Sequence, residues 1–175
     1  EVKAILDYCE AHRITCTVVD EHHICACYPS EALRRVFVEY LHAKEVPGVT
    51  PAEALRLIPD VCQLSPFFDE EQEREIRPLL PNCEIGRWHP AFVDVSALGC
   101  NKQLGIDLMC RRFGIDVTDT MAIGDGGNDI PMLRHAGIGV AMGNANETVK
   151  AEADYVTDTV DQDGIAKALQ HFGLV

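Results

Sequence analysis

The first 57 residues show helical and extended hydrophobic patterns in turn. Four apolar residues recur at positions i, i+3, i+4 and i+7, which predicts a helix ending near His12: Val2, Ile5, Leu6 and Cys9. Two short runs of strand-forming residues, 14–19 and 24–28, flank the polar segment 20–23 and predict a hairpin. Ser30 can cap a second helix, for which we expect a buried stripe made of Leu33, Val36, Phe37, Tyr40 and Leu41.

Clear start and stop signals mark the following elements. Thr50-Pro51-Ala52-Glu53 places a capping hydroxyl, a proline at the first helical position and a returning carboxylate in order, which predicts a helix. Residues 61–68 predict a strand, and a further helix opens at Asp69 and is ended by prolines at 78 and 81. Residues 83–95 form an extended pattern that is interrupted at 89–90.

From this point helical and extended patterns alternate strictly. We expect helices over 101–113, 128–135, 146–152 and 163–172, and strands over 121–124, 138–142 and 153–157. The first of these helices has an expected buried stripe of Ile106, Met109, Cys110 and Phe113. This order is typical of α/β proteins with a parallel sheet, whereas the first half is typical of an α+β unit. We therefore predict two domains, 1–92 and 93–175.

Composition excludes several classes of partner. The 175 residues carry 15 Lys and Arg against 28 Asp and Glu, a net charge of −13, and no basic run, which argues against nucleic acid and anionic membrane as partners. No run approaches the roughly 18 apolar residues of a membrane-spanning helix. Eight cysteines without CxxC spacing indicate reduced thiols, so we expect a soluble cytoplasmic protein.

The densest chemical signal follows the expected strand 121–124. Asp125 and Asp129 lie four residues apart with glycines between them, at a strand end where α/β proteins bind ligands. Two close carboxylates repel each other unless a cation lies near them, and oxygen ligands of this kind suit Mg²⁺. The alternative is a polar turn in which Asn128 only caps the next helix.

Lys102 occupies the first turn of the expected helix 101–113. The positive end of the helix dipole disfavours a cation there unless the cation meets an anion. The alternative is an ordinary solvated lysine. Trp88, His89 and Phe92, at the expected junction of the two domains, are interpreted as packing residues rather than substrate contacts.

Three stretches of the second half together resemble the C-terminal part of haloacid dehalogenase superfamily phosphatases, in particular the Cof-like sugar-phosphatase branch. They are Gly124-Asp125-Gly-Gly-Asn128-Asp129 with Met132-Leu133, the run Ala136-Gly-Ile-Gly-Val-Ala-Met-Gly-Asn144-Ala, and Asp154-Tyr-Val-Thr. The resemblance covers about residues 92–175. It implies the second half of a Rossmann-like parallel sheet core, with the preceding region as an inserted α+β cap domain of the C2 type.

The resemblance also implies roles for individual residues. Asp125 and Asp129 match the family's Mg²⁺ motif, with Asp129 also catalytic. Lys102 matches the lysine that stabilises the attacking aspartate and the transferring phosphoryl group, and Asn128 matches a position that reaches phosphate or substrate. The cap is expected to close over the site and choose the substrate.

One departure from the family pattern is large. The Asp-x-Asp-x-Thr/Ser motif that carries the family's nucleophile does not occur in residues 1–175. We therefore expect that the N-terminal half of the core is missing from this chain, that the isolated chain is inactive, and that an exposed sheet edge favours homodimers or aggregation.

The resulting hypothesis is a Mg²⁺-dependent phosphohydrolase that acts on small phosphorylated metabolites such as sugar phosphates, through an aspartyl-phosphate. Two alternatives remain: a non-catalytic binding or regulatory module of the same fold, and a phosphomutase.

Overall fold

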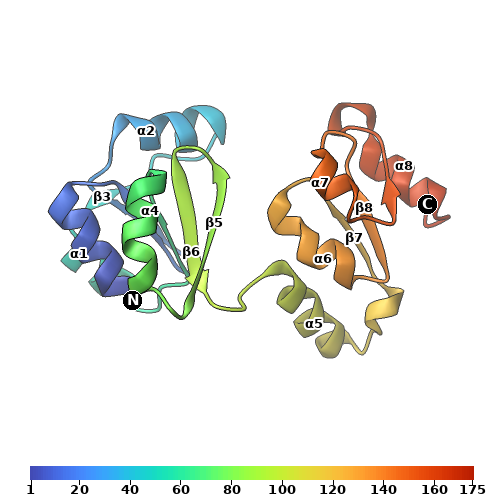
Figure 1. Cartoon of the computed structure of the whole chain (residues 1–175), viewed down its shortest axis with the longest axis horizontal. Helices are drawn as coiled ribbons and strands as arrows, with labels where there is room; N and C mark the ends of the chain where they lie inside the picture. The colour runs from blue at the N-terminus through green and yellow to red at the C-terminus, as the bar shows by residue number, and fades with distance from the viewer. The chain divides into compact units, whose positions relative to one another are not determined.

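The computed structural model describes all 175 residues and contains two compact units, 1–98 and 99–175 (Figure 1). The division lies six residues after the expected boundary at residue 92. The reason is strand β6 (Phe92–Ala97), which pairs with β4 (Gln63–Pro66) and β5 (Cys83–His89) and so belongs to the first unit's sheet. Both units are mixed α/β structures, in agreement with the expected class.

The first unit is built on a six-stranded sheet with the order β3-β2-β1-β4-β6-β5. All neighbouring pairs are antiparallel except β2 and β3. Its remaining elements are α1 (Val2–His12), β1 (Cys16–Val19), β2 (Ile24–Cys27), α2 (Glu31–Leu33), η1 (Arg34–Tyr40), β3 (Gly48–Val49), α3 (Pro51–Leu57), α4 (Glu70–Ile76) and η2 (Arg77–Leu79).

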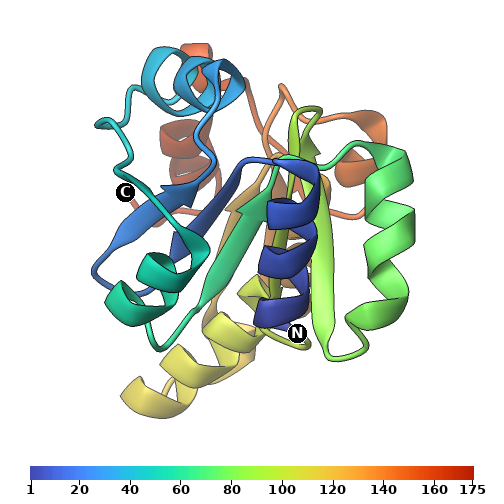
Figure 2. The same ribbon diagram turned by 90° about the vertical axis from the view of Figure 1, so that its left-hand side faces the viewer.

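One face of this sheet carries the core of the unit. Figure 2 shows α1, α3 and α4 in front of the strands, on the same side. Side chains from these helices pack on alternate strand residues: Ile5, Leu6, Cys9, Cys16, Val18, Cys25, Cys27, Ala54, Leu64, Ile76, Val93 and Val95. The period of two in a strand sends the intervening residues to the opposite face.

The expected helix after Ser30 differs from the prediction. Ser30 does cap its start, but from Arg34 to Tyr40 the chain forms a π-helix. Leu33 and Val36 are buried, whereas Tyr40 and Leu41 are exposed. Because a π-helix closes its turns with i→i+5 bonds, residues three and four apart drift off a common face, and the predicted stripe is lost after Val36.

The second unit holds a parallel sheet of order β7-β8-β9. Helices connect successive strands, as the alternating pattern predicts. The elements are α5 (Lys102–Phe113), η3 (Val117–Asp119), β7 (Met121–Gly124), η4 (Gly127–Asp129), α6 (Ile130–His135), β8 (Ile138–Ala141), α7 (Glu147–Lys150), β9 (Tyr155–Val156), η5 (Val160–Gln162) and α8 (Gly164–His171).

A glycine sets the distance between α6 and the sheet. A Cβ at Gly139 of β8 would lie 2.2 Å from the carbonyl oxygen of Leu133, which no side chain can tolerate. The close approach lets Leu133 pack fully into a small core with Ala122, Ala141 and Val149.

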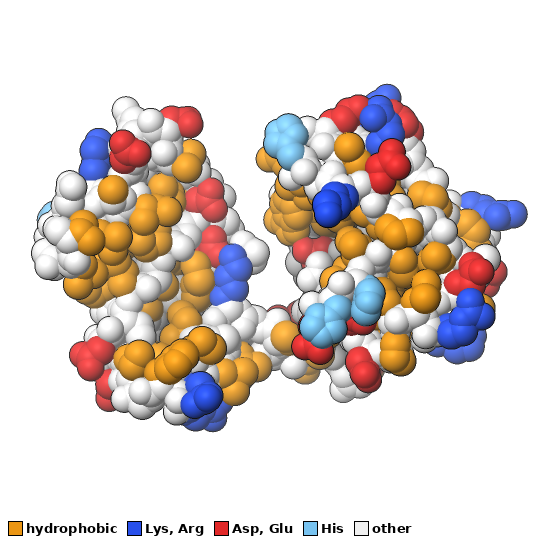
Figure 3. All heavy atoms as spheres, turned by 180° about the vertical axis from the view of Figure 1, so that it is seen from behind, with side chains coloured by type: hydrophobic (Ala, Val, Ile, Leu, Met, Phe, Trp, Pro, Cys, Tyr) orange, Lys and Arg blue, Asp and Glu red, His pale blue; other side chains and the backbone are white.

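The stripe expected on α5 is mostly exposed. Only Cys110 is buried, while hydrophobic side chains gather along the helix surface (Figure 3): Leu104, Leu108, Met109 and Phe113. Of the expected stripe, Ile106 packs against the core of the second unit and Cys110 is buried, whereas Met109 and Phe113 are exposed. None of the chain's helices has both the length and the apolar character that crossing a bilayer requires.

The capping box at α3 yields a stability prediction. Thr50 Oγ1 accepts a hydrogen bond from Glu53 N at 3.3 Å, and Glu53 Oε2 accepts one from Thr50 N at 2.9 Å. Thr50→Ala should lower the free energy of unfolding of the first unit by about 1 kcal/mol. Urea unfolding followed by fluorescence of Trp88, the chain's one tryptophan, measures this. Thr50→Ser, which keeps the hydroxyl, is the control; equal losses in both variants would contradict the prediction.

Candidate functional site

Polar residues meet at the carboxyl ends of the parallel strands in the second unit. Asp125 follows β7 directly, and Asn144 is the third residue after the end of β8. Lys102 begins α5 and reaches the same place, because its ammonium donates to Asp129 Oδ1. The site therefore lies where open α/β sheets place ligands, and within a single unit.

Asp129 is the buried centre of this site, with 4% of its surface exposed. Its Oδ2 accepts hydrogen bonds from the backbone N–H groups of Asp125 and Gly126, both at 2.9 Å. Burial alone would favour the neutral acid. The Lys102 ammonium and the two N–H groups outweigh it and hold the pKa of Asp129 below its usual range. Asp129 is thus an ionised carboxylate that closes the loop and orients Lys102.

Gly124 makes room for that carboxylate. A Cβ at Gly124 would lie 2.6 Å from the Cβ of Asp129, so any side chain there would displace Asp129. The glycine at the strand end is required by this close approach and not by an unusual backbone angle, since its φ is not positive.

Asp125 is exposed and oriented by a residue that the sequence analysis did not select. Asn144 Nδ2 donates to Asp125 Oδ2 at 2.9 Å, and Asn144 Oδ1 accepts from Val160 N at 3.3 Å. Asn144 thus fixes the Asp125 carboxylate from the neighbouring strand end. Its place just after the next strand is a signal that could have found it, because parallel strands end at one edge.

Asn128 is exposed and makes no hydrogen bond that caps α6. The N-cap of η4 is Gly126, and the N-cap of α6 is Asp129. The turn interpretation, in which Asn128 only caps a helix, therefore does not describe this loop.

The donor set fits a hard divalent cation at Asp125. Mg²⁺ in proteins is typically held by one or two carboxylates and completes its shell with water and substrate oxygens. Asp125 offers exposed carboxylate oxygen on a braced side chain, while three of the roughly four lone pairs of Asp129 are already in use. No group of three metal-binding side chains gathers anywhere in the chain.

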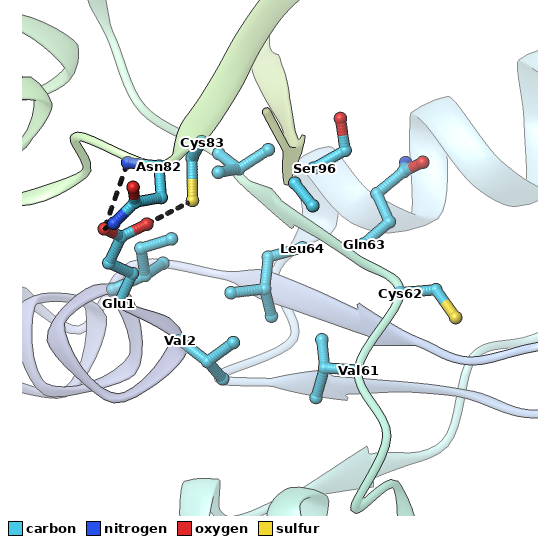
Figure 4. A pocket seen from close by; sticks show the side chains of 12 residues that line it. Glu1, Val2, Val61, Cys62, Gln63, Leu64, Asn82, Cys83 and Ser96 are labelled. Carbon is cyan, nitrogen blue, oxygen red and sulfur yellow. Dashed lines mark hydrogen bonds between the residues drawn. The ribbon is translucent and has the colours of Figure 1, made fainter. Parts of the chain in front are cut away.

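A pocket in the first unit is a weaker candidate (Figure 4). It has a volume of about 390 Å³ and lies beside the start of α1, with Glu1, Asn82 and Cys83 as its polar edge. Glu1 accepts hydrogen bonds from Asn82 and from the Cys83 thiol, so these groups satisfy one another. Burial, together with Glu1, raises the pKa of Cys83 to about 11, which leaves an unreactive thiol.

Comparisons with known proteins identify the family of the chain. The model of the haloacid dehalogenase-like hydrolase family matches residues 1–169. Among curated proteins, YkrA of Bacillus subtilis is 41% identical over 116 residues, which are 66% of this chain and 45% of the relative. The 5-amino-6-(5-phospho-D-ribitylamino)uracil phosphatase YcsE of the same organism is 46% identical over 91 residues, 52% of this chain and 36% of the relative.

Solved structures extend the similarity to both units. The HAD subclass IIB sugar phosphatase BT4131 has a TM-score of 0.90 and 52% identity, and the match covers 99% of this chain and 66% of that one. BT1666 from Bacteroides thetaiotaomicron, described among phosphatases of the HAD superfamily, has a TM-score of 0.84 and 38% identity over 99% and 64% of the two chains. The chain thus spans less than half the length of the two curated relatives and about two thirds of these solved chains. On this evidence the chain belongs to the haloacid dehalogenase-like hydrolase family.

Proposed function

We propose that this chain is part of a Mg²⁺-dependent phosphohydrolase that acts on small phosphate monoesters such as sugar phosphates. The observation that carries the proposal is the Lys102–Asp129 pair beside Asp125 at the carboxyl end of β7. Two of the similar proteins are named as phosphatases, one of a phosphoribityl compound and one of sugars. A further similar structure, with a TM-score of 0.91, is described as showing a trigonal-bipyramidal intermediate in phosphoryl transfer.

Each residue of the site has a proposed role. The ammonium of Lys102 is about half exposed and uses one donor on Asp129, so the remaining donors can bind oxygens of a phosphoryl group and stabilise the charge that develops during transfer. Asp129 acts through Lys102 as its positioning residue. Asn128, exposed in the same loop, is proposed to contact phosphate or substrate.

Asp125 is the proposed protein ligand of Mg²⁺, with Asn144 holding its orientation. The bound ion supplies charge neutralisation for the phosphoryl oxygens. The sequence predicts both Asp125 and Asp129 as ligands of Mg²⁺. Because the Asp129 carboxylate already accepts hydrogen bonds from Lys102 and two backbone N–H groups, we propose Asp125 as the direct ligand.

The attacking carboxylate of the proposed aspartyl-phosphate route is assigned to a segment outside these 175 residues, because no Asp-x-Asp-x-Thr/Ser motif occurs within them. The uncovered apolar face of α5 and the unpaired outer edge of β7 support this proposal, since parallel sheets are normally covered on both faces. The isolated chain is accordingly proposed to be inactive, and the first unit to serve as a cap that excludes water.

Replacement of Lys102 tests the proposed function in a chain that also contains the proposed nucleophile segment. Lys102→Ala should lower kcat about 10²- to 10³-fold, as expected when one donor to developing charge is removed. Steady-state hydrolysis of a sugar phosphate measures this, with Lys167→Ala as a control from an exposed ion pair. Unchanged turnover in Lys102→Ala would refute the role and favour a non-catalytic module.

The same pair predicts a pH effect in the 175-residue chain. Lys102→Met removes the ammonium and should raise the pKa of Asp129 in the folded state. A carboxyl whose folded pKa lies below its unfolded value stabilises the fold above the unfolded pKa, and that contribution is lost as the pH falls through the folded pKa. Acid unfolding of the variant should therefore begin at higher pH. Carbon-13 NMR titration of the Asp129 carboxyl measures the shift; the same titration in Lys167→Ala should match the wild type.

Asp125 predicts where a divalent ion binds. Mn²⁺, used as a paramagnetic substitute for Mg²⁺, should broaden the amide signals of residues 124–126 and 144 in the 175-residue chain. Asp125→Asn should abolish the broadening, and Asp161→Asn, an exposed acid elsewhere in the unit, should preserve it. Equal broadening in the Asp125 variant would place the ion elsewhere.

A further inference from the structure

The chain segment at the end of β9 lies against the residues that follow β8. We call residues 157–164 the post-β9 turn. Gly143 N donates to Asp158 O of this turn at 3.0 Å, and a Cβ at Gly143 would lie 2.8 Å from the carbonyl carbon of Asp158. Only glycine permits so close an approach. The next residue, Asn144, accepts a hydrogen bond from Val160 N at 3.3 Å, so the post-β9 turn reaches the candidate site through this one side chain.

A buried threonine closes the post-β9 turn. Thr157 is 6% exposed, and its Oγ1 donates to Gly164 O at 2.7 Å, which ties the first residue of the turn to the last. Its backbone N donates to Ala141 O at 2.9 Å, and Gly164 N donates to Thr159 O at 3.0 Å. Buried polar groups that are all paired hold a segment in one arrangement. The hydroxyl of Thr157 therefore fixes the turn relative to the end of the sheet.

The turn determines which way the amide of Asn144 faces. Because Val160 N–H is a donor, it selects the amide oxygen, Oδ1, and leaves Nδ2 to donate to Asp125 Oδ2 at 2.9 Å. The reversed amide would bring an oxygen against the carboxylate and leave Val160 N–H without an acceptor. No other side chain donates to the carboxylate of Asp125, so its orientation depends on Asn144.

We propose that Thr157 is a positioning residue for Asp125, acting through the post-β9 turn and Asn144. Its hydroxyl fixes the turn, the turn presents Val160 N–H to Asn144, and Asn144 presents its amide N–H to the Asp125 carboxylate. In terms of the proposed function, on which this clause rests, Thr157 raises the affinity of Asp125 for a divalent cation, because a carboxylate already held in one orientation loses less freedom when it binds.

The first part of the test uses the metal-free 175-residue chain. Thr157→Val keeps the volume of the side chain and removes the hydroxyl donor, whereas Thr157→Ser keeps the hydroxyl. Nitrogen-15 NMR records the side-chain amide signals of Asn144 and the backbone amide signal of Val160. We expect Thr157→Val to shift these signals and to speed hydrogen exchange at Val160 about tenfold, and Thr157→Ser to resemble the wild type.

The second part measures the affinity for Mn²⁺ by titration, followed through the broadening of the amide signals of residues 124–126. Thr157→Val should bind Mn²⁺ about threefold to tenfold more weakly, a smaller loss than the roughly 10- to 100-fold that follows removal of a direct partner of a metal ligand. Thr157→Ser should restore the affinity of the wild type.

Val149→Ala separates positioning from stability. Val149 is fully buried in the core of the second unit, so its truncation leaves a cavity and lowers the free energy of unfolding. Urea unfolding followed by the amide signals of β8 measures this loss for Val149→Ala and for Thr157→Val. We expect Val149→Ala to leave the signals of Asn144 and the affinity for Mn²⁺ unchanged.

Two outcomes would overturn the proposal: wild-type signals of Asn144 and Val160 in Thr157→Val, or an equal loss of Mn²⁺ affinity in Thr157→Val and Val149→Ala. The second would mean that Thr157 acts through stability alone. The test is separable from the proposed function. If Mn²⁺ did not bind at residues 124–126 of the wild type, the proposed metal site would fail, while the signals of the metal-free chain would still decide whether Thr157 positions Asn144.

Discussion

The ion pair between Lys102 and the buried carboxylate of Asp129 is the interaction on which the arrangement of the second unit's site depends. Asp129 is almost fully buried, and an ionised carboxylate is stable there only because a cation and two backbone N–H groups offset its lost hydration. The same three contacts fix the start of α5, the loop after β7 and the start of α6. The pair therefore neutralises Asp129 and also holds the half-exposed ammonium of Lys102 at the strand ends.

The division of work between Asp125 and Asp129 follows from burial. The two acids are equivalent in the sequence motif. Asp129 faces inward against Gly124, whereas Asp125 is exposed and accepts a hydrogen bond from Asn144. Only the outer carboxylate is free to exchange a water molecule for another ligand. The two acids can coexist four residues apart because the Lys102 ammonium and two backbone N–H groups offset the charge of Asp129.

The two faces of the first unit's sheet differ in chemical character. Its helix-covered face is apolar and supplies the hydrophobic stabilisation, whereas its other face carries Ser65, Asp94 and Trp88 in a fixed hydrogen-bonded row. Because side chains alternate along a strand, a polar residue can face away from the core between two core residues, as Asp94 does between Val93 and Val95. The aromatic residues that the sequence analysis interpreted as packing do pack, since Phe92 is buried, yet Trp88 among them is half exposed.

Local patterns in the sequence determined a good deal by themselves. The capping boxes at Thr50 and Asp69, the hairpin around residues 20–23, the alternating elements of the second half and the chemical character of the loop from Asp125 to Asp129 all depend on residues a few positions apart. The family resemblance rests on the same kind of short-range motif, and the family model matches residues 1–169. Only the tertiary structure decided that the helix after Ser30 widens into a π-helix, that β6 belongs with the first sheet, and that Met109 and Phe113 of the α5 stripe stay exposed. It alone joined Lys102 to Asp129, Asn144 to Asp125, and Ser65 to Asp94. The physical reason is that periodicity states which face of an element is apolar, whereas the neighbour that meets each face depends on strand order and register, which are set by contacts between residues far apart in the chain.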